Sequence, residues 1–156
     1  MSDARWIEID ADVASALIHF GRAVEIFEAG GLEGDDLDAY KSRMALLQAM
    51  QAGHTSLEAA LERILVLLGE EKPVLSATYH ADLVRRVSSP IPGARPAVIS
   101  GALARAVDET RRFRHVARKA YDGFEVPRAE PAVAAARVVR DALAEAIAGF
   151  RRALDG

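Results

Sequence analysis

Apolar residues recur every three or four positions along most of this 156-residue chain, and no stretch keeps the two-residue alternation of a strand. Gly30 and Gly31 are expected to end the first such run, because glycine adopts the left-handed conformation that closes a helix. The pattern therefore predicts an all-α fold. The apolar residues of this first run are Val13, Leu17, Phe20, Val24 and Phe27.

A second helix is expected to begin near Asp35 and Asp36, because acidic residues favour a helix N-terminus. Beyond Gly53 the helical pattern resumes, and two interpretations are open. A new helix can start at Thr55, which forms a capping-box spacing with Glu58. We favour one long helix through Gly53, because a lone glycine costs only about 1 kcal/mol there. The apolar side of the first half is expected to hold Leu37, Tyr40, Met44, Leu47 and Met50.

Prolines set residues 69–98 apart from the rest of the chain and leave room for one short helix, residues 79–87. A connection of this length inside a compact domain usually has a function or covers part of the domain. Ser100 is expected to start a helix to about Tyr121 or Asp122, and a last helix is expected from about Pro131 to Leu154. We therefore predict a single domain, residues 1–156, built as a bundle of four main helices plus a short helix.

Several classes of function are disfavoured by the sequence. There is no cysteine, so disulfides, thiolate metal sites and cysteine nucleophiles are excluded. There is no Glu-x-x-His pair, and His19, His54 and His80 are isolated in sequence, so we expect no metal and no cofactor. The N-terminus lacks the apolar core of a signal peptide, and no apolar run is long enough for a membrane helix. We expect a cytoplasmic protein that does not contact a membrane.

A concentrated run of basic residues interrupts a chain whose net charge is −3. Residues 111–122 hold five Lys or Arg, one His and one Tyr. On a helix, Arg114, Arg118 and Tyr121 lie along one stripe, because they are four and three residues apart. A local cationic patch predicts an anionic ligand, whereas the alternative interpretation is a solvated basic face.

This segment resembles the motif of the HEPN superfamily, and within it the HepT-like ribonuclease toxins. In that motif an arginine is followed after four to six residues by a histidine, one further residue and a tyrosine. Here Arg114, four residues, Lys119, Ala120 and Tyr121 occupy those positions. Residues 90–98 and, more loosely, residues 50–68 are also similar to the HepT-like form, so the resemblance covers most of residues 45–125.

The resemblance implies a HEPN-type helical bundle that acts as a homodimer and cleaves RNA without a metal, as the toxin of a toxin–antitoxin pair. It implies that Arg114 stabilises the scissile phosphate. Lys119 stands where the family has the histidine that activates the ribose 2′-hydroxyl, and an ordinary lysine is protonated at neutral pH. Tyr121 completes the predicted catalytic set and matches the tyrosine that a partner nucleotidyltransferase, acting as antitoxin, modifies with AMP.

Around this set, Arg111, His115 and Arg118 are expected to contact the RNA backbone. Glu58 and Glu62 share a helical face and are expected to approach the arginines and orient Arg114, or else to be ordinary surface acids. Two other functions stay open. One is a non-catalytic HEPN module that binds nucleotide or RNA, or is the partner and AMP-modified substrate of a nucleotidyltransferase. The other is a helical oligomerisation domain without an anion site.

Overall fold

The computed structural model describes residues 4–119 and 125–156, and those residues form five α-helices and no strand. The prediction of an all-α bundle with four long helices and one short helix is confirmed. None of the described helices is long and apolar enough to cross a membrane. The helices are α1 (Ala4–Ala29), α2 (Leu37–Leu67), α3 (Tyr79–Val87), α4 (Gly101–Lys119) and α5 (Val126–Asp155).

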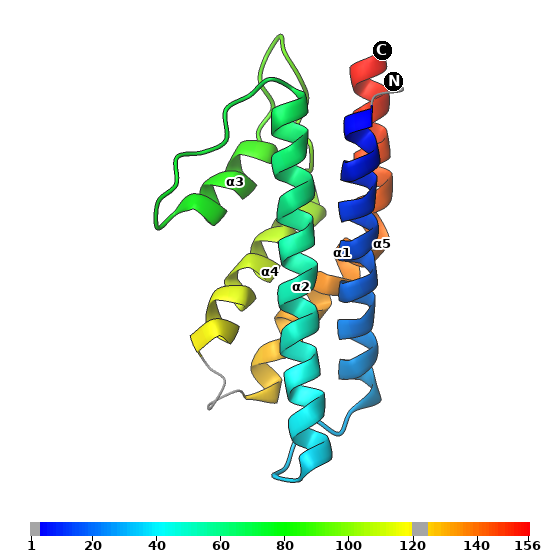
Figure 1. The fold of residues 1–156 in the computed structure, drawn as a ribbon, viewed down its shortest axis with the longest axis vertical. Helices are drawn as coiled ribbons and strands as arrows, with labels where there is room; N and C mark the ends of the chain where they lie inside the picture. The colour runs from blue at the N-terminus through cyan, green and yellow to red at the C-terminus, as the bar shows by residue number, and fades with distance from the viewer. Residues whose placement is uncertain (1–3, 120–124) are drawn as a thin grey trace.

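The long helices α1 and α2 run side by side along the length of the molecule (Figure 1). The C-terminal part of α5 runs beside α1, so the two ends of the chain lie together. There the guanidinium of Arg151 lies 4.8 Å from the centre of the Trp6 ring. Helices α3 and α4 lie on the other side of α2, and both contact it. This arrangement makes α2 the common support for the two shorter helices.

Helix ends follow the expected local chemistry. Gly30 and Gly31 both have φ of +74° and end α1 in the left-handed region. Asp36 caps α2, and its side chain accepts a hydrogen bond from the backbone N–H of Ala39 at 3.3 Å. The short helix spans the predicted residues 79–87, and α4 begins directly after Ser100.

Two details of the prediction were wrong. Leu37 and Tyr40 are 64% and 54% exposed, because the first turn of α2 extends past the end of α1 and has no helix to pack against. The last helix begins at Val126 and not near Pro131. Pro127 lies in its first turn, where no N–H is needed, and Pro131 removes only the bond to the carbonyl of Pro127.

Gly53 lies inside one continuous helix, which settles the choice between the two interpretations in favour of the long α2. Gly53 is buried against the ring of Phe20, which is itself fully buried on α1. A Cβ at this position would come within 2.9 Å of two carbons of that ring. The glycine therefore lets α1 and α2 approach closely at their midpoint.

Replacing Gly53 with alanine is expected to lower the free energy of unfolding by about 1–3 kcal/mol, the usual range for overpacking a filled core. The clash with Phe20 opposes the roughly 1 kcal/mol that alanine gains in helix propensity. Urea unfolding followed by circular dichroism measures the difference. Gly149→Ala on α5 is the matched control, because its Cβ would meet only Arg152, at 3.6 Å, and it should stabilise the protein. Equal stabilisation by both variants would contradict this account of Gly53.

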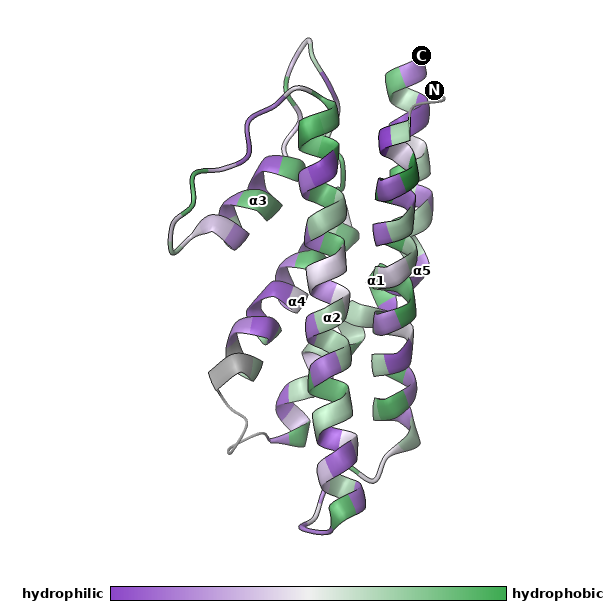
Figure 2. Ribbon diagram, in the orientation of Figure 1, coloured by the Kyte–Doolittle hydropathy of each residue, from purple (hydrophilic) through white to green (hydrophobic). Residues whose placement is uncertain are grey.

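The proline-rich connection between α2 and α4 is folded onto the bundle by its own polar contacts. The buried guanidinium of Arg95 binds the carboxylate of Glu70 and the backbone carbonyls of Arg86, Ser89 and Pro96. The backbone N–H of Val98 donates to the carbonyl of Val87 at 2.8 Å. Leu83 and Val87 of α3 are fully buried, whereas α4 is largely hydrophilic (Figure 2). The connection thus places α3 beside the basic helix.

Candidate anion-binding site between α3 and α4

A pocket of about 180 Å³ opens between α3 and α4. Its walls come from the proline-rich connection and α3 on one side and from the basic helix on the other. Arginine, histidine and threonine supply its polar groups, and none of the described residues that line it is acidic. The lining residues are Ala77, Thr78, His80, Ala81, Arg111, Arg114 and His115.

Three of the predicted site residues meet in this pocket. Arg111, Arg114 and His115 are at positions i, i+3 and i+4 of α4, so they share one face of the helix. The neighbouring side chains of Phe113 and Ala117 are buried and fix this face at the edge of the core. The face that holds Arg111, Arg114 and His115 therefore borders the buried side of α4.

The other three predicted residues cannot be placed in the pocket. The side chains of Arg118 and Lys119 lie outside the described part of the structure, and so does the whole of Tyr121. Their roles stay predictions.

Glu58 is the centre of the polar contacts behind the pocket. Its side chain is only 8% exposed, and its two carboxylate oxygens have different partners. Oε1 lies 3.6 Å from Nη1 of Arg114, while Oε2 lies 2.7 Å from Nδ1 of His80 and 3.4 Å from Nε2 of His54. The expectation that Glu58 orients Arg114 is confirmed by this contact. The matching expectation for Glu62 was wrong, because its carboxylate points to Lys72 at 3.6 Å.

The ionisation of Glu58 follows from its partners. Burial raises the pKa of this carboxyl, but its interactions with His54 and His80 outweigh burial and hold the pKa below 4.5. Arg114 adds a further positive charge beside the other oxygen. Glu58 is therefore an anion at neutral pH and attracts the guanidinium of Arg114.

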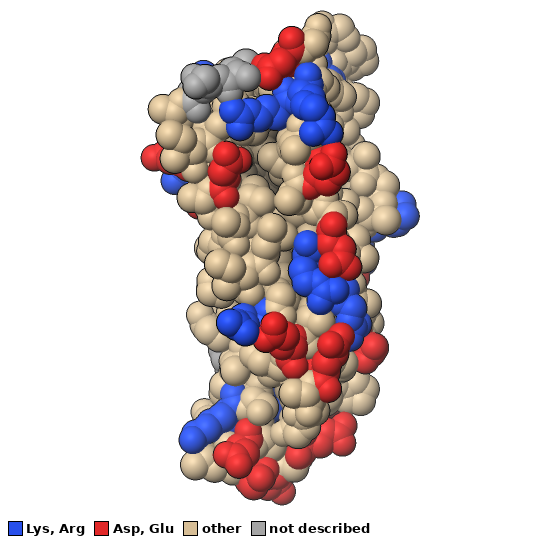
Figure 3. Space-filling view, turned by 90° about the vertical axis from the view of Figure 1, so that its right-hand side faces the viewer, with Lys and Arg blue, Asp and Glu red and all other residues tan. Residues whose placement is uncertain are grey.

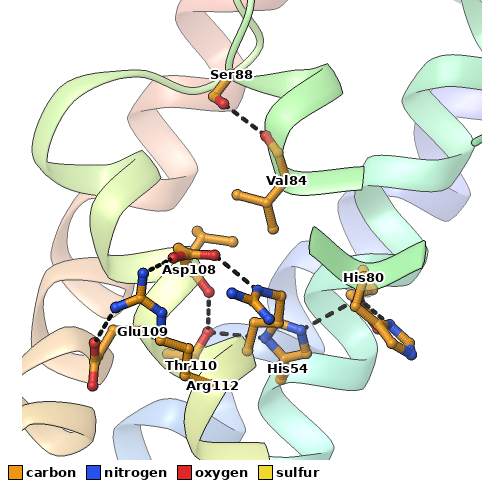
Figure 4. Close-up of polar contacts among 11 residues, drawn as sticks. His54, His80, Val84, Ser88, Asp108, Glu109, Thr110 and Arg112 are labelled. Carbon is orange, nitrogen blue, oxygen red and sulfur yellow. Dashed lines mark hydrogen bonds and ion pairs between the residues drawn. The ribbon is translucent and has the colours of Figure 1, made fainter. Parts of the chain in front are cut away.

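His54 ties this carboxylate to α4. It is fully buried, and its Nδ1 lies 2.9 Å from the hydroxyl of Thr110, beside which Figure 4 shows the imidazole ring. Its Nε2 faces Glu58 at an ion-pair distance but outside hydrogen-bond geometry. The Thr110 hydroxyl donates its proton to the carbonyl of Val107 at 2.8 Å, so Nδ1 of His54 is the donor in its contact with Thr110. His54 thereby links α2 and α4 just behind Arg114.

Sequence reasoning missed His54, His80 and Thr110. His54 and His80 are isolated in sequence, but the fold brings both to the same carboxylate. A signal for His54 was present, since His54 and Glu58 are four residues apart on one helix. No local signal links His80 to Glu58, which lies 22 residues earlier. Within the described residues, no three His, Asp or Glu side chains form a group able to hold a metal ion.

The basic run is less uniformly cationic than its sequence indicates. Arg111 and Arg112 both pair with Asp108 at 2.8 Å, and Arg112 also lies 3.7 Å from Glu109. On the side of the molecule formed by α1 and α5, basic and acidic groups are likewise interleaved (Figure 3). Pockets beside Arg43, Arg63 and Arg85 also contain basic side chains, and each of them contains an acidic side chain as well. The α3–α4 pocket differs from them because the described residues that line it include basic side chains and no acidic side chain.

Residues 45–154 match a family model described as HepT-like protein. The match covers more than half of the chain and includes the whole of α3 and α4 and the Glu58 region of α2. Comparisons with curated proteins and with solved structures gave no match.

Proposed function

Because the chain belongs to the HepT-like family, we propose that it is a metal-independent RNA endonuclease of toxin–antitoxin type that binds the scissile phosphate in the α3–α4 pocket. The observation that carries the proposal is the lining of this pocket by two arginines and two histidines without a carboxylate. A volume of about 180 Å³ suits a phosphate group and is small for a whole nucleotide. The bases of the RNA would then lie outside the pocket.

Arg114 has the geometry for a phosphate contact. Its side chain is 23% exposed, and its 3.6 Å separation from Glu58 is longer than a hydrogen bond. Glu58 therefore fixes the position of the guanidinium without using up its N–H donors. A guanidinium has five such donors in a planar fork that matches two phosphate oxygens. Arg111, one turn earlier, lines the same pocket, and its Nε donates to Asp108 at 2.8 Å, so Asp108 offsets part of its charge.

The proposal is tested by incubating the purified protein with labelled RNA in EDTA. Wild type is expected to cleave RNA and to leave DNA of the same sequence intact, because DNA lacks the 2′-hydroxyl. Arg114→Ala is expected to lower kcat/KM by about 10²–10³-fold, the usual cost of removing a group that stabilises developing charge. Product analysis by mass spectrometry should find a 2′,3′-cyclic phosphate at the new end.

Arg105→Ala is the matched control, because Arg105 is an exposed arginine of α4 outside the pocket lining. It should cleave within a few-fold of wild type. Intact RNA after incubation with wild type would contradict the endonuclease, and so would full activity in Arg114→Ala.

A non-catalytic RNA-binding module is the second candidate, and Lys119 is the observation that favours it. It predicts RNA binding without cleavage, with an affinity that falls as salt rises. For single strands the slope of log K against log salt is about −0.7 per phosphate contact. A slope near zero would instead indicate an oligomerisation domain.

Four further features stay predictions: the homodimer, the nucleotidyltransferase partner, the cytoplasmic location and the single domain of residues 1–156.

A further inference from the structure

We propose that Glu58 and His80 form a carboxylate–histidine pair whose imidazole accepts the proton of the ribose 2′-hydroxyl, the task for which Lys119 is unsuited. This inference rests on the proposed RNA cleavage and names the group that takes the proton. His80 is on α3, outside the basic motif, and lines the same pocket as Arg114.

The contact with Glu58 fixes which nitrogen of His80 can act. Nδ1 of His80 lies 2.7 Å from Oε2 of Glu58. An ionised carboxylate only accepts hydrogen bonds, so Nδ1 carries the proton in this contact. In the neutral ring the lone pair is then on Nε2. No described residue forms a hydrogen bond with Nε2, so this atom is available as a proton acceptor.

The position of the ring is also constrained. The Tyr79 ring packs against it edge-on, with the centres 5.5 Å apart and the planes at 82°. Tyr79 is itself buried, and Glu62 on α2 interacts with its hydroxyl, which with burial raises the pKa of this tyrosine. His80 is nevertheless 44% exposed, so a ligand in the pocket can reach it. The imidazole is thus held in place and open to substrate.

One carboxylate positions both groups that the reaction needs. Oε1 of Glu58 lies beside Arg114, which would bind the phosphate, and Oε2 holds His80. His54 and Thr110 support the same carboxylate from behind. A phosphodiester bound to Arg114 would therefore place its neighbouring ribose on the side of His80. His115 also lines the pocket, but no described carboxylate fixes its ring.

The proposed step balances without any further reactant. Nε2 of His80 takes the proton from the 2′-hydroxyl, and the 2′-oxygen forms a bond to phosphorus. The bond from phosphorus to the 5′-oxygen breaks, and that oxygen leaves with a proton from solvent. The products are a 2′,3′-cyclic phosphate and a 5′-hydroxyl, and His80 returns its proton to solvent.

The test uses His80→Asn, because the asparagine amide occupies the place of Nδ1 and keeps the contact with Glu58 while Nε2 is lost. We expect kcat for RNA cleavage to fall by at least about 10²-fold, the usual contribution of a general base, with little change in KM or in the unfolding midpoint. His19→Asn on α1 is the control and should match wild type. In His80→Ala, added imidazole should restore part of the activity, because the site is open to solvent.

Two results would overturn the inference. One is that wild type and His80→Asn cleave RNA equally well while Lys119→Ala has lost activity. This result would leave the proposed endonuclease intact and exclude only His80 as the proton acceptor. The other comes from ¹⁵N NMR of the imidazoles, which reports the tautomer without any cleavage assay. A proton on Nε2 and none on Nδ1 of neutral His80 would exclude the pair. An inactive wild type would remove the proposed function and the role of His80 with it.

Discussion

Arg95→Ala is expected to lower the free energy of unfolding by about 3–5 kcal/mol, the usual cost of removing one partner from a buried ion pair. The Arg95 side chain is only 2% exposed, although its charge is on a loop. Its Nε and Nη2 bind the two oxygens of Glu70, and the hydrogen bond from Arg95 holds the pKa of Glu70 below its usual value. Without the guanidinium, a partly buried carboxylate is left without its main partner.

The backbone of the connection depends on the same side chain. Nη1 of Arg95 donates to the carbonyls of Ser89 and Pro96, both at 3.0 Å, and Nη2 donates to that of Arg86 at 3.3 Å. Each of these carbonyls would lose a donor, which adds to the cost. Because the connection carries α3, we expect hydrogen exchange to accelerate first in the amides of α3 and residues 88–98.

Urea unfolding of Arg95→Ala and Arg85→Ala provides the comparison. Arg85 belongs to the same segment but is 75% exposed and pairs only with Asp82 along its helix. Exposed pairs of this kind contribute about 0.2–1 kcal/mol, so Arg85→Ala should be nearly neutral. A loss below about 1 kcal/mol in Arg95→Ala would show that the connection does not depend on this guanidinium.

Helix positions were predictable from sequence because each depends on neighbouring residues. The prolines on both sides of residues 79–87 left room for one short helix, and α3 has those bounds. Exposure was harder to predict. Leu37 continues the apolar side of α2 by periodicity, but it lies beyond the end of the helix that would have covered it. Periodicity defines a helix face, and only the lengths of neighbouring helices decide how much of that face is buried.

The candidate site was predictable only where its residues share one helix. Arg111 and Arg114 were found from their spacing, His115 from its place in the basic run, and Glu58 from its position on the neighbouring helix. His80 was not, because its contact with Glu58 depends on how the proline-rich connection folds back. The resemblance places the proton-accepting residue at position 119, where this chain has Lys119. The fold instead brings the imidazole of His80 into the pocket that Arg114 lines.

Glu58→Gln is expected to lower the free energy of unfolding by about 3 kcal/mol at neutral pH. A hydrogen bond to a charged group contributes roughly 1.5–3 kcal/mol, and the carboxylate has such a bond with His80 at 2.7 Å. It also lies at ion-pair distance from His54 and Arg114, so the charge has further partners to lose. The amide keeps the shape of the side chain but removes the charge, and its NH₂ group must face one of these donors. Chemical unfolding of both proteins near pH 7 measures the loss.

The pH dependence separates lost charge from altered packing. The pKa of Glu58 is lower in the folded protein than the ordinary value of 4.5, so its charge stabilises the fold fully above that pH. As pH falls below 4.5 and through the folded value, the carboxylate of wild type takes up a proton and this stabilisation is lost. The gap between wild type and Glu58→Gln should therefore shrink in acid. Glu25→Gln on α1, whose side chain is 65% exposed and pairs with Arg22, should cost under about 1 kcal/mol. A gap that stays constant down to the acid unfolding transition would mean that packing, and not the charge of Glu58, holds α2 to α3 and α4.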